Sequence, residues 1–416
     1  MSNNITFSDI GAKADPKGYG ATEINAYSGK ISHDKAGRSA LEIAESELGY
    51  DGSVETDEEY KQLVEEKVGD FLKKLAKAGH TSTFYQANNG VNYEVPRHTT
   101  MFMCQFDHSK FLQQSQRYTE AKEFISAFEG DSRVEDLYSR SKELYNHMIS
   151  DEGDEVRKED ARYVLPLATA AKHIHQNLNM ISLANMYREM EKSSARIPGL
   201  SKKAIEKGRK ELEKFEPVLF SKEIIDTYNT NGKGYTVTNM FSETNKALKE
   251  IDEPENGDVS TFCKHVDLEK DDFKESFLNL SNYGVMNSSV RGFITSMSLS
   301  AWHQFMRNDM VKQSVESVYD AAEERKLVVP PSVKESEYLE EFQKVLEDSM
   351  SLYDELKEES GDDAVEVVPH ALELDVAFTV DYFNIERGFV KDREHGGAQW
   401  EIREIAKQVY KSVKGS

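Results

Sequence analysis

The sequence predicts an α+β protein built from two tandem domains, and three observations lead to this prediction. The chain has 416 residues, enough for two compact domains of roughly 200 residues each. Amphipathic helical patterns alternate with short segments that are rich in β-branched and aromatic residues. Two blocks of sequence also recur, in the same order, in the second half of the chain.

The repeated blocks indicate an internal duplication. Residues 105–118 contain a Gln-Phe pair and a Gln-Ser pair. The same two pairs occur with the same spacing in residues 304–314, at an offset of 199 residues. The apolar run 161–166 recurs at 364–369, at an offset of 203 residues. Because both blocks keep their order and nearly keep their spacing, we expect a repeated domain packed as a pseudo-dimer.

The boundary between the domains is expected at Pro217, which follows a basic helical segment at residues 202–215. We therefore predict a first domain at residues 1–217 and a second, more divergent domain at residues 218–416.

Composition limits the partners. With 52 basic and 75 acidic residues, the net charge of −23 disfavours nucleic acid, whereas two or three clustered arginines can still hold one small phosphorylated ligand. Cys104 and Cys263 are far apart and lack metal-ligand spacing, so we expect free thiols and no metal site. No apolar run approaches the roughly 18 residues of a membrane span, and the amino terminus lacks a signal-peptide pattern. A soluble cytoplasmic protein is expected.

The first domain is expected to be mainly helical around a few strands. Thr56 is a suitable cap for a helix over residues 56–75, and Gly79 lies where a left-handed C-cap belongs. Residues 84–104 predict one or two strands. Helices are expected from residue 105, over 118–150, around 178–186 and over 202–215. His173 and His175 fall in a segment interpreted as helical, where residues two apart cannot chelate a metal together.

The second domain shows a similar alternation. Residues 232–240 resemble a strand, an amphipathic helix covers residues 338–353, and a last helix follows residues 398–402.

Four segments, in order, resemble the flavin-dependent thymidylate synthase family, also called ThyX: Gly79-His80-Thr81-Ser82, the stretch 105–118, Ala161-Arg162-Tyr163-Val164-Leu165-Pro166-Leu167, and Ala398-Gln399-Trp400-Glu401-Ile402-Arg403. The last of these is the most specific. The resemblance implies that each domain has a small, mainly antiparallel sheet flanked by helices. It also implies a homodimer, since two duplicated chains would imitate the family's tetramer.

The resemblance implies a nucleotide site shared by both halves. Ser115, Arg117 and Arg162 match family residues that grip the phosphate and sugar of a deoxyuridine nucleotide. The family's essential closing arginine falls on Met190 in the first half and on Arg393 in the second. In the family these two groups come from different subunits, so a fused pair implies one composite site. The second half lacks the other arginines, because Glu316 and Val365 occupy the positions equivalent to Arg117 and Arg162.

The resemblance also assigns cofactor-binding residues. His80, Ser82, Asn179 and Asn185 match positions near the flavin, FAD, and His80 is a catalytic candidate together with Arg393. Methylenetetrahydrofolate as carbon donor and NADPH as reductant are the implied co-substrates. However, the chain has Gln105-Phe106-Asp107 where the family has an Arg-His-Arg group that binds flavin. Arg97-His98 lies too far before Arg117 to replace that group.

Two functions follow. The first is an enzyme that modifies C5 of a deoxyuridine monophosphate by transfer of a methyl or other one-carbon group. The second is a non-catalytic nucleotide-binding or scaffolding homologue that has lost flavin binding. Each site residue also has a structural alternative: Arg117 and Arg162 as ion-pair partners, Arg393 paired with Glu394 or Asp392, and His80 as a turn residue.

Overall fold

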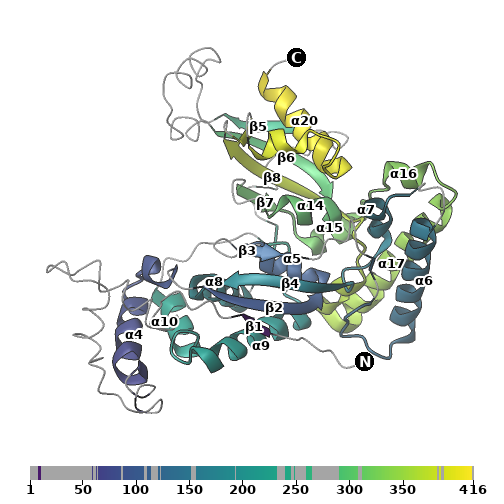
Figure 1. Cartoon of the computed structure of the whole chain (residues 1–416). Coiled ribbons are helices and arrows are strands. Elements are labelled where there is room, and N and C mark those ends of the chain that lie inside the picture. Colours follow the sequence, from purple (N-terminus) through teal and green to yellow (C-terminus); the bar gives the residue numbers. More distant parts are fainter. Residues whose placement is uncertain are drawn as a thin grey trace. The chain divides into compact units, whose positions relative to one another are not determined.

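The computed structural model describes residues 8–10, 59, 62, 64–85, 88–106, 110–113, 120–121, 123–150, 156–192, 194–231, 239–244, 248, 259–264, 290–307, 312–381, 384–385 and 388–414. The chain divides into two compact units (Figure 1). The first unit comprises residues 1–114, 170–195 and 199–237, and the second comprises 115–169, 196–198 and 238–416. Each contains helices and one small antiparallel sheet, which confirms the predicted α+β class.

The first unit is organised around a four-stranded sheet with the order β1-β2-β4-β3. Its strands are β1 (Ser8–Ile10), β2 (Asn89–Pro96), β3 (Lys110–Leu112) and β4 (Ala170–Leu178). The central pair, β2 and β4, is antiparallel, and its register aligns Tyr93 with Ile174, both of which are buried.

Five α-helices and two single-turn helices complete the described part of the first unit. They are η1 (Val64–Val68), α4 (Gly69–Lys77), η2 (Thr81–Tyr85), α5 (Arg97–Cys104), α8 (Met180–Glu191), α9 (Gly199–Phe215) and α10 (Lys222–Asn231). The turn after α4 has Gly79 at φ 71°, which confirms the left-handed position predicted there. Helix α10 packs against both α4 and α8.

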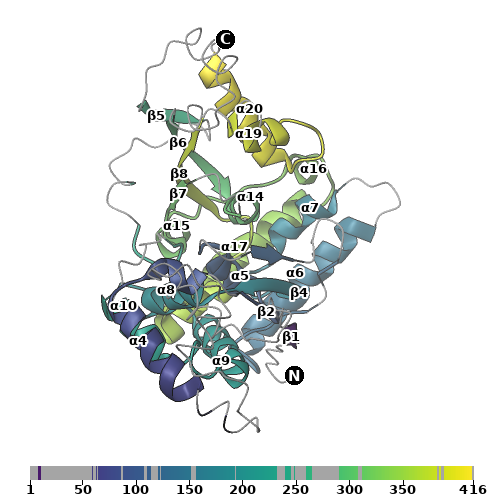
Figure 2. The ribbon, with the colours of Figure 1, turned by 60° about the vertical axis from the view of Figure 1, so that its left-hand side comes forward.

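The second unit has a sheet of the same design, with the order β5-β6-β8-β7. Its strands are β5 (Ser260–Lys264), β6 (Val290–Ser298), β7 (Lys312–Val315) and β8 (Glu373–Asp381). Its helices are α6 (Ser132–Ser150), α7 (Lys158–Ala161), η3 (Arg162–Val164), α14 (Leu299–Phe305), α15 (Val318–Glu324), α16 (Pro331–Lys334), α17 (Leu339–Ser360), η5 (Gly361–Val367), α19 (Phe389–Arg393) and α20 (Trp400–Lys414). The long helices α6 and α17 lie side by side in both ribbon views (Figures 1 and 2).

The duplication seen in the sequence is present in the fold. In the first repeat β2, α5 and β3 are followed by α6, η3 and β4, and in the second β6, α14 and β7 are followed by α17, η5 and β8. The strands also occupy equivalent places in their sheets.

Backbone hydrogen bonds within the second unit extend this symmetry to single residues. Four bonds join the end of η3 to the end of η5 and fall into two pairs: Leu167 N to Val368 O with His370 N to Leu165 O (both 2.9 Å), and Ala168 N to Glu366 O (2.9 Å) with Ala371 N to Tyr163 O (3.0 Å). Within each pair, the two donor residues differ by 203 in residue number, and so do the two acceptor residues. The segment that donates in one bond therefore accepts in the other. This is the pattern of an isologous two-fold contact, here within one chain.

Several predicted elements differ from the structure. Residues 97–104, expected as strand, form α5, because Pro96 closes β2 and the helix that follows is buried on all sides. Residues 170–178, interpreted partly as helix, form strand β4, where residues two apart share a face. The reason given against a shared metal site at His173 and His175 is therefore wrong. His175 Nδ1 lies 3.0 Å from Asn92 Oδ1, and the described residues contain no group of three potential metal ligands.

Other expectations have mixed outcomes. The helix expected over 118–150 begins only at Ser132. The helices expected at 202–215, 338–353 and after 398–402 are confirmed as α9, α17 and α20. Thr56, most of the strand-like segment 232–240 and the side chain of Cys263 lie outside the described residues. The boundary at Pro217 stays a prediction.

Candidate functional site

Arg162 is held rigidly in the second unit. It starts η3 directly after α7, is 7% exposed, and its Nε donates to Glu159 O at 3.1 Å. The turn bond Leu165 N to Arg162 O has its counterpart in Val368 N to Val365 O, both 3.1 Å. The second repeat therefore has valine where the first has this arginine, and only one of the two equivalent turns carries a cation.

The neighbouring Tyr163 lies in a buried polar cluster that joins both repeats. Its hydroxyl donates to Glu401 Oε2 and accepts from Gln399 Nε2. Glu401 also accepts from Ser298, at 2.8 Å from the backbone N and 2.6 Å from Oγ. Burial, with the carboxylate of Glu401 beside it, raises the pKa of Tyr163 well above its usual value. The Ala-Gln-Trp-Glu-Ile segment thus joins the start of α20 to η3 and to the end of β6.

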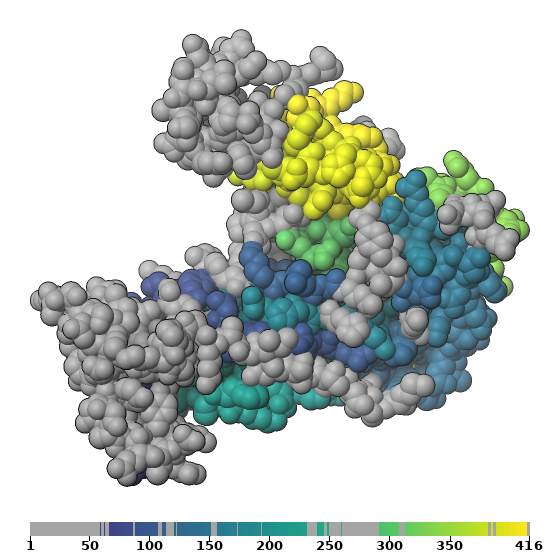
Figure 3. Space-filling view, viewed as in Figure 1, coloured from purple at the N-terminus to yellow at the C-terminus, as the bar shows by residue number. Residues whose placement is uncertain are grey.

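Arg393 ends α19, five residues before that segment begins. Its side chain is exposed, and its guanidinium carbon lies 5.6 Å from the centre of the Phe389 ring. Glu394 forms an ion pair with Lys391 instead, with 2.7 Å between Lys391 Nζ and Glu394 Oε2. Within the described residues, Arg393 has no carboxylate partner. The structural alternative of a pair with Glu394 is therefore absent here. Helices α19 and α20, in yellow in Figure 3, lie at the surface of the second unit.

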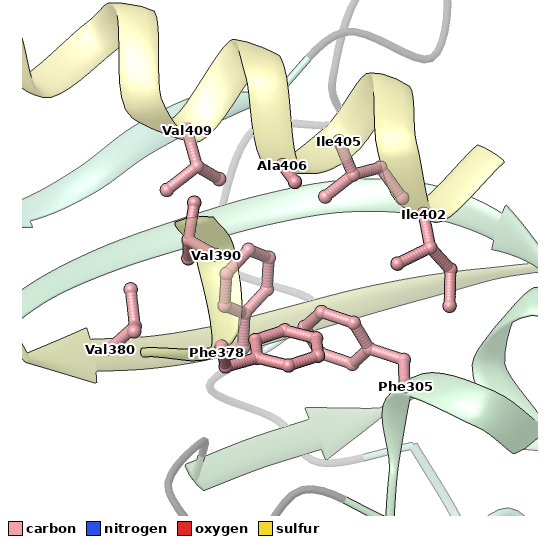
Figure 4. A pocket seen from close by; sticks show the side chains of 9 residues that line it. Phe305, Phe378, Val380, Val390, Ile402, Ile405, Ala406 and Val409 are labelled. Atoms are coloured by element: carbon pink, nitrogen blue, oxygen red, sulfur yellow. The ribbon is translucent and has the colours of Figure 1, made fainter. Parts of the chain in front are cut away.

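Helix α19 covers a small apolar pocket (Figure 4). The lining side chains come from the sheet, α14, α19 and α20: Phe305, Phe378, Val380, Phe389, Val390, Ile402, Ile405, Ala406 and Val409. No charged side chain lines this pocket, so a nucleotide phosphate has no partner within it. Its relevance to the site is structural, because its apolar side chains pack α19, which carries Arg393, against the sheet and α20.

Ser115 and Arg117 lie outside the described residues. Their counterparts in the second repeat are described: Ser314 is in β7, and Glu316 follows it. Glu316 is buried, accepts from Asp375 N at 2.9 Å, and has its pKa raised to about 7 by burial. A carboxyl group at this position repels a phosphate once it ionises, so the second repeat cannot offer the phosphate grip expected of the first.

The residues expected near a flavin all belong to the first unit. His80 and Ser82 are exposed, around the start of η2, and η2 packs against α8, which carries Asn185. Asn179 is the N-cap of α8: its Oδ1 accepts from Ser182 N at 2.9 Å, and its Nδ2 donates to Asn88 Oδ1 at 3.3 Å. Asn185 is 3% exposed, and its Oδ1 has no hydrogen-bond partner.

The residues at the position of the family's Arg-His-Arg group do not fit a flavin. Gln105 Nε2 donates to Met101 O of its own helix at 2.9 Å. Phe106 is 2% exposed and packs edge-on against Phe102, with ring centres 5.0 Å apart. Both side chains serve the local fold, and neither supplies a cationic donor.

Arg97 and His98 are structural, as their distance from Arg117 suggested. Burial lowers the pKa of His98 to about 3, and its Nδ1 lies 3.0 Å from Ser201 Oγ. Arg97 Nη1 donates to Gln113 Oε1 at 3.1 Å.

Comparison with known proteins identifies the family. The model of the thymidylate synthase complementing protein family, Thy1, matches residues 26–197 and 239–416, and the chain belongs to this family. The two matched segments correspond to the two repeats. Among solved structures, the chain is similar to a UMP/dUMP methylase, PolB, from Streptomyces cacaoi bound with 5-Br dUMP. Sequence identity is 17% over 55% of this chain and 96% of that chain, with a TM-score of 0.36. No curated protein matches the chain.

In the part of the chain that the structure describes, no helix is long and apolar enough to cross a membrane.

Proposed function

We propose that the chain binds a deoxyuridine monophosphate and modifies its C5 carbon, by methyl or other one-carbon transfer, in a composite site formed by both repeats. Membership of the Thy1 family supports a thymidylate-synthase-like enzyme. The observation that carries the composite site is the buried link from Tyr163 to Gln399 and Glu401. It ties the turn that carries Arg162, from the first repeat, to the helix that directly follows Arg393, from the second.

The roles of the residues follow from charge. A nucleotide monophosphate is a dianion, and arginine provides fixed, always-charged donors in a fork that matches phosphate oxygens. We assign Arg162 and Arg393 to this task, together with Ser115 and Arg117, and Arg393 and His80 are the catalytic candidates. Methylenetetrahydrofolate and NADPH are the proposed co-substrates.

A second function has its own support. Gln105 and Phe106 are committed to the local fold where the family binds flavin. This favours a non-catalytic homologue that keeps the nucleotide pocket, and no step through a flavin is part of our proposal.

Calorimetry with deoxyuridine monophosphate tests the pocket. Replacing Arg393 by alanine removes a charge-assisted contact worth roughly 1.5–3 kcal/mol, so binding should weaken by about tenfold or more. Because Arg393 is exposed, the fold should survive. Lys391→Ala, two residues earlier on the same helix, is the matched control and should bind within about twofold of the wild type. Equal losses in both variants would contradict a specific role for Arg393.

Turnover separates the two functions. Replacement of the C5 hydrogen releases tritium from deoxyuridine monophosphate labelled at C5. Release in the presence of methylenetetrahydrofolate, NADPH and FAD supports the enzyme, whereas tight binding without release, and without flavin absorbance after incubation with excess FAD, supports the homologue.

A further inference from the structure

Arg188, in the last turn of α8, has a buried guanidinium group without a partner among the described residues. Its Nη1 and Nη2 are both inaccessible to solvent, and neither makes a hydrogen bond. Arg209, on the neighbouring helix α9, shows the contrast. It donates to Glu206 at 3.0 Å, to Glu213 at 2.7 Å and to Phe220 O at 3.2 Å. A buried cation normally has such partners, because burial without them carries a large desolvation cost.

The carboxylates on α8 and on the two helices that pack against it, α9 and α10, are all engaged elsewhere. Helices α8, α9 and α10 carry seven, and each pairs with another cation: Glu189 with Lys192, Glu191 and Asp226 with Lys222, Glu206 and Glu213 with Arg209, Glu211 with Lys214, and Glu223 with Lys73. In a chain with a net charge of −23, the lack of a counter-ion for Arg188 is not due to a shortage of acids.

Two unsatisfied acceptors belong to the same region of the first unit. Asn185 is three residues before Arg188 on α8, a spacing that puts both side chains on one side of the helix. Its Oδ1 is buried without a partner, as is Oδ1 of Asn229 on α10. Asn229 is anchored to α8 through Nδ2, which donates to Ala184 O at 3.0 Å, directly before Asn185.

We propose that Arg188, Asn185 and Asn229 form a binding site for an anionic group in the first unit. The guanidinium binds a phosphate or carboxylate through two parallel hydrogen bonds. The two amide oxygens accept hydrogen bonds from a hydroxyl or N–H group next to that anion. The ligand class is therefore a small phosphate ester or carboxylic acid that carries an adjacent donor.

Thermal unfolding of the full chain tests the site, with inorganic phosphate and succinate as probes against sodium chloride of equal ionic strength. A ligand that binds only the folded state raises the melting temperature, and the rise increases with the logarithm of ligand concentration above the Kd. We expect one probe to raise it by several degrees in the wild type. Phosphate and succinate distinguish the two anion classes.

Variants locate the effect. Arg188→Gln should abolish the rise, and Arg188→Lys, which keeps the charge and loses the fork, should weaken it several-fold. Lys74→Gln, at an exposed lysine of α4, removes one charge from the same unit and should retain the full rise. Arg393→Ala should retain it as well, because that residue belongs to the other site.

Three results would overturn the proposal. The first is that neither anion exceeds sodium chloride in the wild type, which is decisive even if Arg188→Gln fails to fold. The second is a rise that survives in Arg188→Gln but disappears in Arg393→Ala, because the anion then occupies the nucleotide site. The third is an equal loss of stability for Arg188→Gln with and without anion, which would make Arg188 a structural residue. In anion-free buffer we expect that variant to be at least as stable as the wild type.

Discussion

Glu401 shows how one carboxylate can hold several elements of the second unit together. It is 8% exposed and accepts hydrogen bonds from Tyr163 on η3 and from both the backbone and the hydroxyl of Ser298. Tyr163 belongs to the first repeat, whereas Ser298 and Glu401 belong to the second. The carboxylate therefore connects segments that are more than a hundred residues apart in sequence.

Glu401→Ala leaves three buried donors without an acceptor, so the free energy of unfolding should fall by about 2–4 kcal/mol. Denaturant unfolding measures this loss. Glu404→Ala, on the exposed face of the same helix, should change stability by less than about 0.5 kcal/mol. A similar small change for Glu401→Ala would mean that the cluster does not stabilise the fold.

Glu316 makes stability depend on pH. Burial raises its pKa from 4.5 to about 7, with Asp375 and Asp320 adding to the shift. The folded state therefore keeps a proton that the unfolded state loses, and stability falls as pH rises from about 4.5 to about 7. Glu316→Gln should remove this loss and raise stability at pH 8 by roughly 1–3 kcal/mol. Urea titrations at pH 5 and pH 8 test the slope, with the exposed Glu347→Gln on α17 as control. An unchanged slope would contradict the assignment.

Among single residues, sequence reasoning recognised Arg162, Asn179 and Glu401 as parts of motifs, but did not anticipate their contacts. Asn179 functions as a helix cap, a role that its place directly before an apolar helix could have indicated. Arg188 and Asn229 carry no recognisable pattern, because an unpaired buried charge becomes visible only after its neighbours have been placed.

At the scale of elements, α19 determines where Arg393 lies. This helix has five residues, and it is anchored mainly by Val390, which is 2% exposed, and by Phe389, whose ring lies 5.5 Å from that of Phe305. Helix α19 also packs against α20, and apolar side chains of both helices line the pocket beneath it (Figure 4).

Phe389→Ala should therefore weaken nucleotide binding several-fold without removing any charged group, and should lower stability by about 1–2 kcal/mol. Calorimetry and thermal unfolding provide the two readouts. Phe215→Ala, at a phenylalanine that is 60% exposed in the first unit, should change neither. If Phe389→Ala binds deoxyuridine monophosphate normally, α19 does not position Arg393.

The elements that were predicted wrongly share a cause. Helix α5 is buried on all sides, and strand β4 has the polar Gln176 among its buried residues, so neither shows a clean alternation of polar and apolar residues. The amphipathic helices α9, α17 and α20 each have one face in solvent, and their periodicity was predictive.

At the scale of the whole molecule, the pseudo-symmetric contact of the second unit makes the two repeats interdependent. Four backbone hydrogen bonds join segment 163–168 to residues 366–371, two donated by each segment. A fragment of residues 1–217 alone would lose those partners. Because the contact is isologous, a second fragment can supply an equivalent surface, and we expect this fragment to self-associate, as measured by light scattering. A monodisperse, folded monomer would contradict the interdependence.

The full chain is expected to form a homodimer that imitates the tetramer of the family. Light scattering at micromolar concentration should give twice the mass of the chain. A monomer would refute this analogy while leaving the internal duplication untouched.

The sequence by itself determined the family, the duplication and the loss of arginines from the second copy, because these depend on residue identity and spacing. It also indicated that Gln105 and Phe106 depart from the family. Only the tertiary structure decided that Tyr163 reaches Glu401, that burial raises the pKa of Glu316 to about 7 and that Arg188 has no counter-ion among the described residues. Burial and pairing arise from residues far apart in the chain, and the local pattern contains no record of which distant groups will meet.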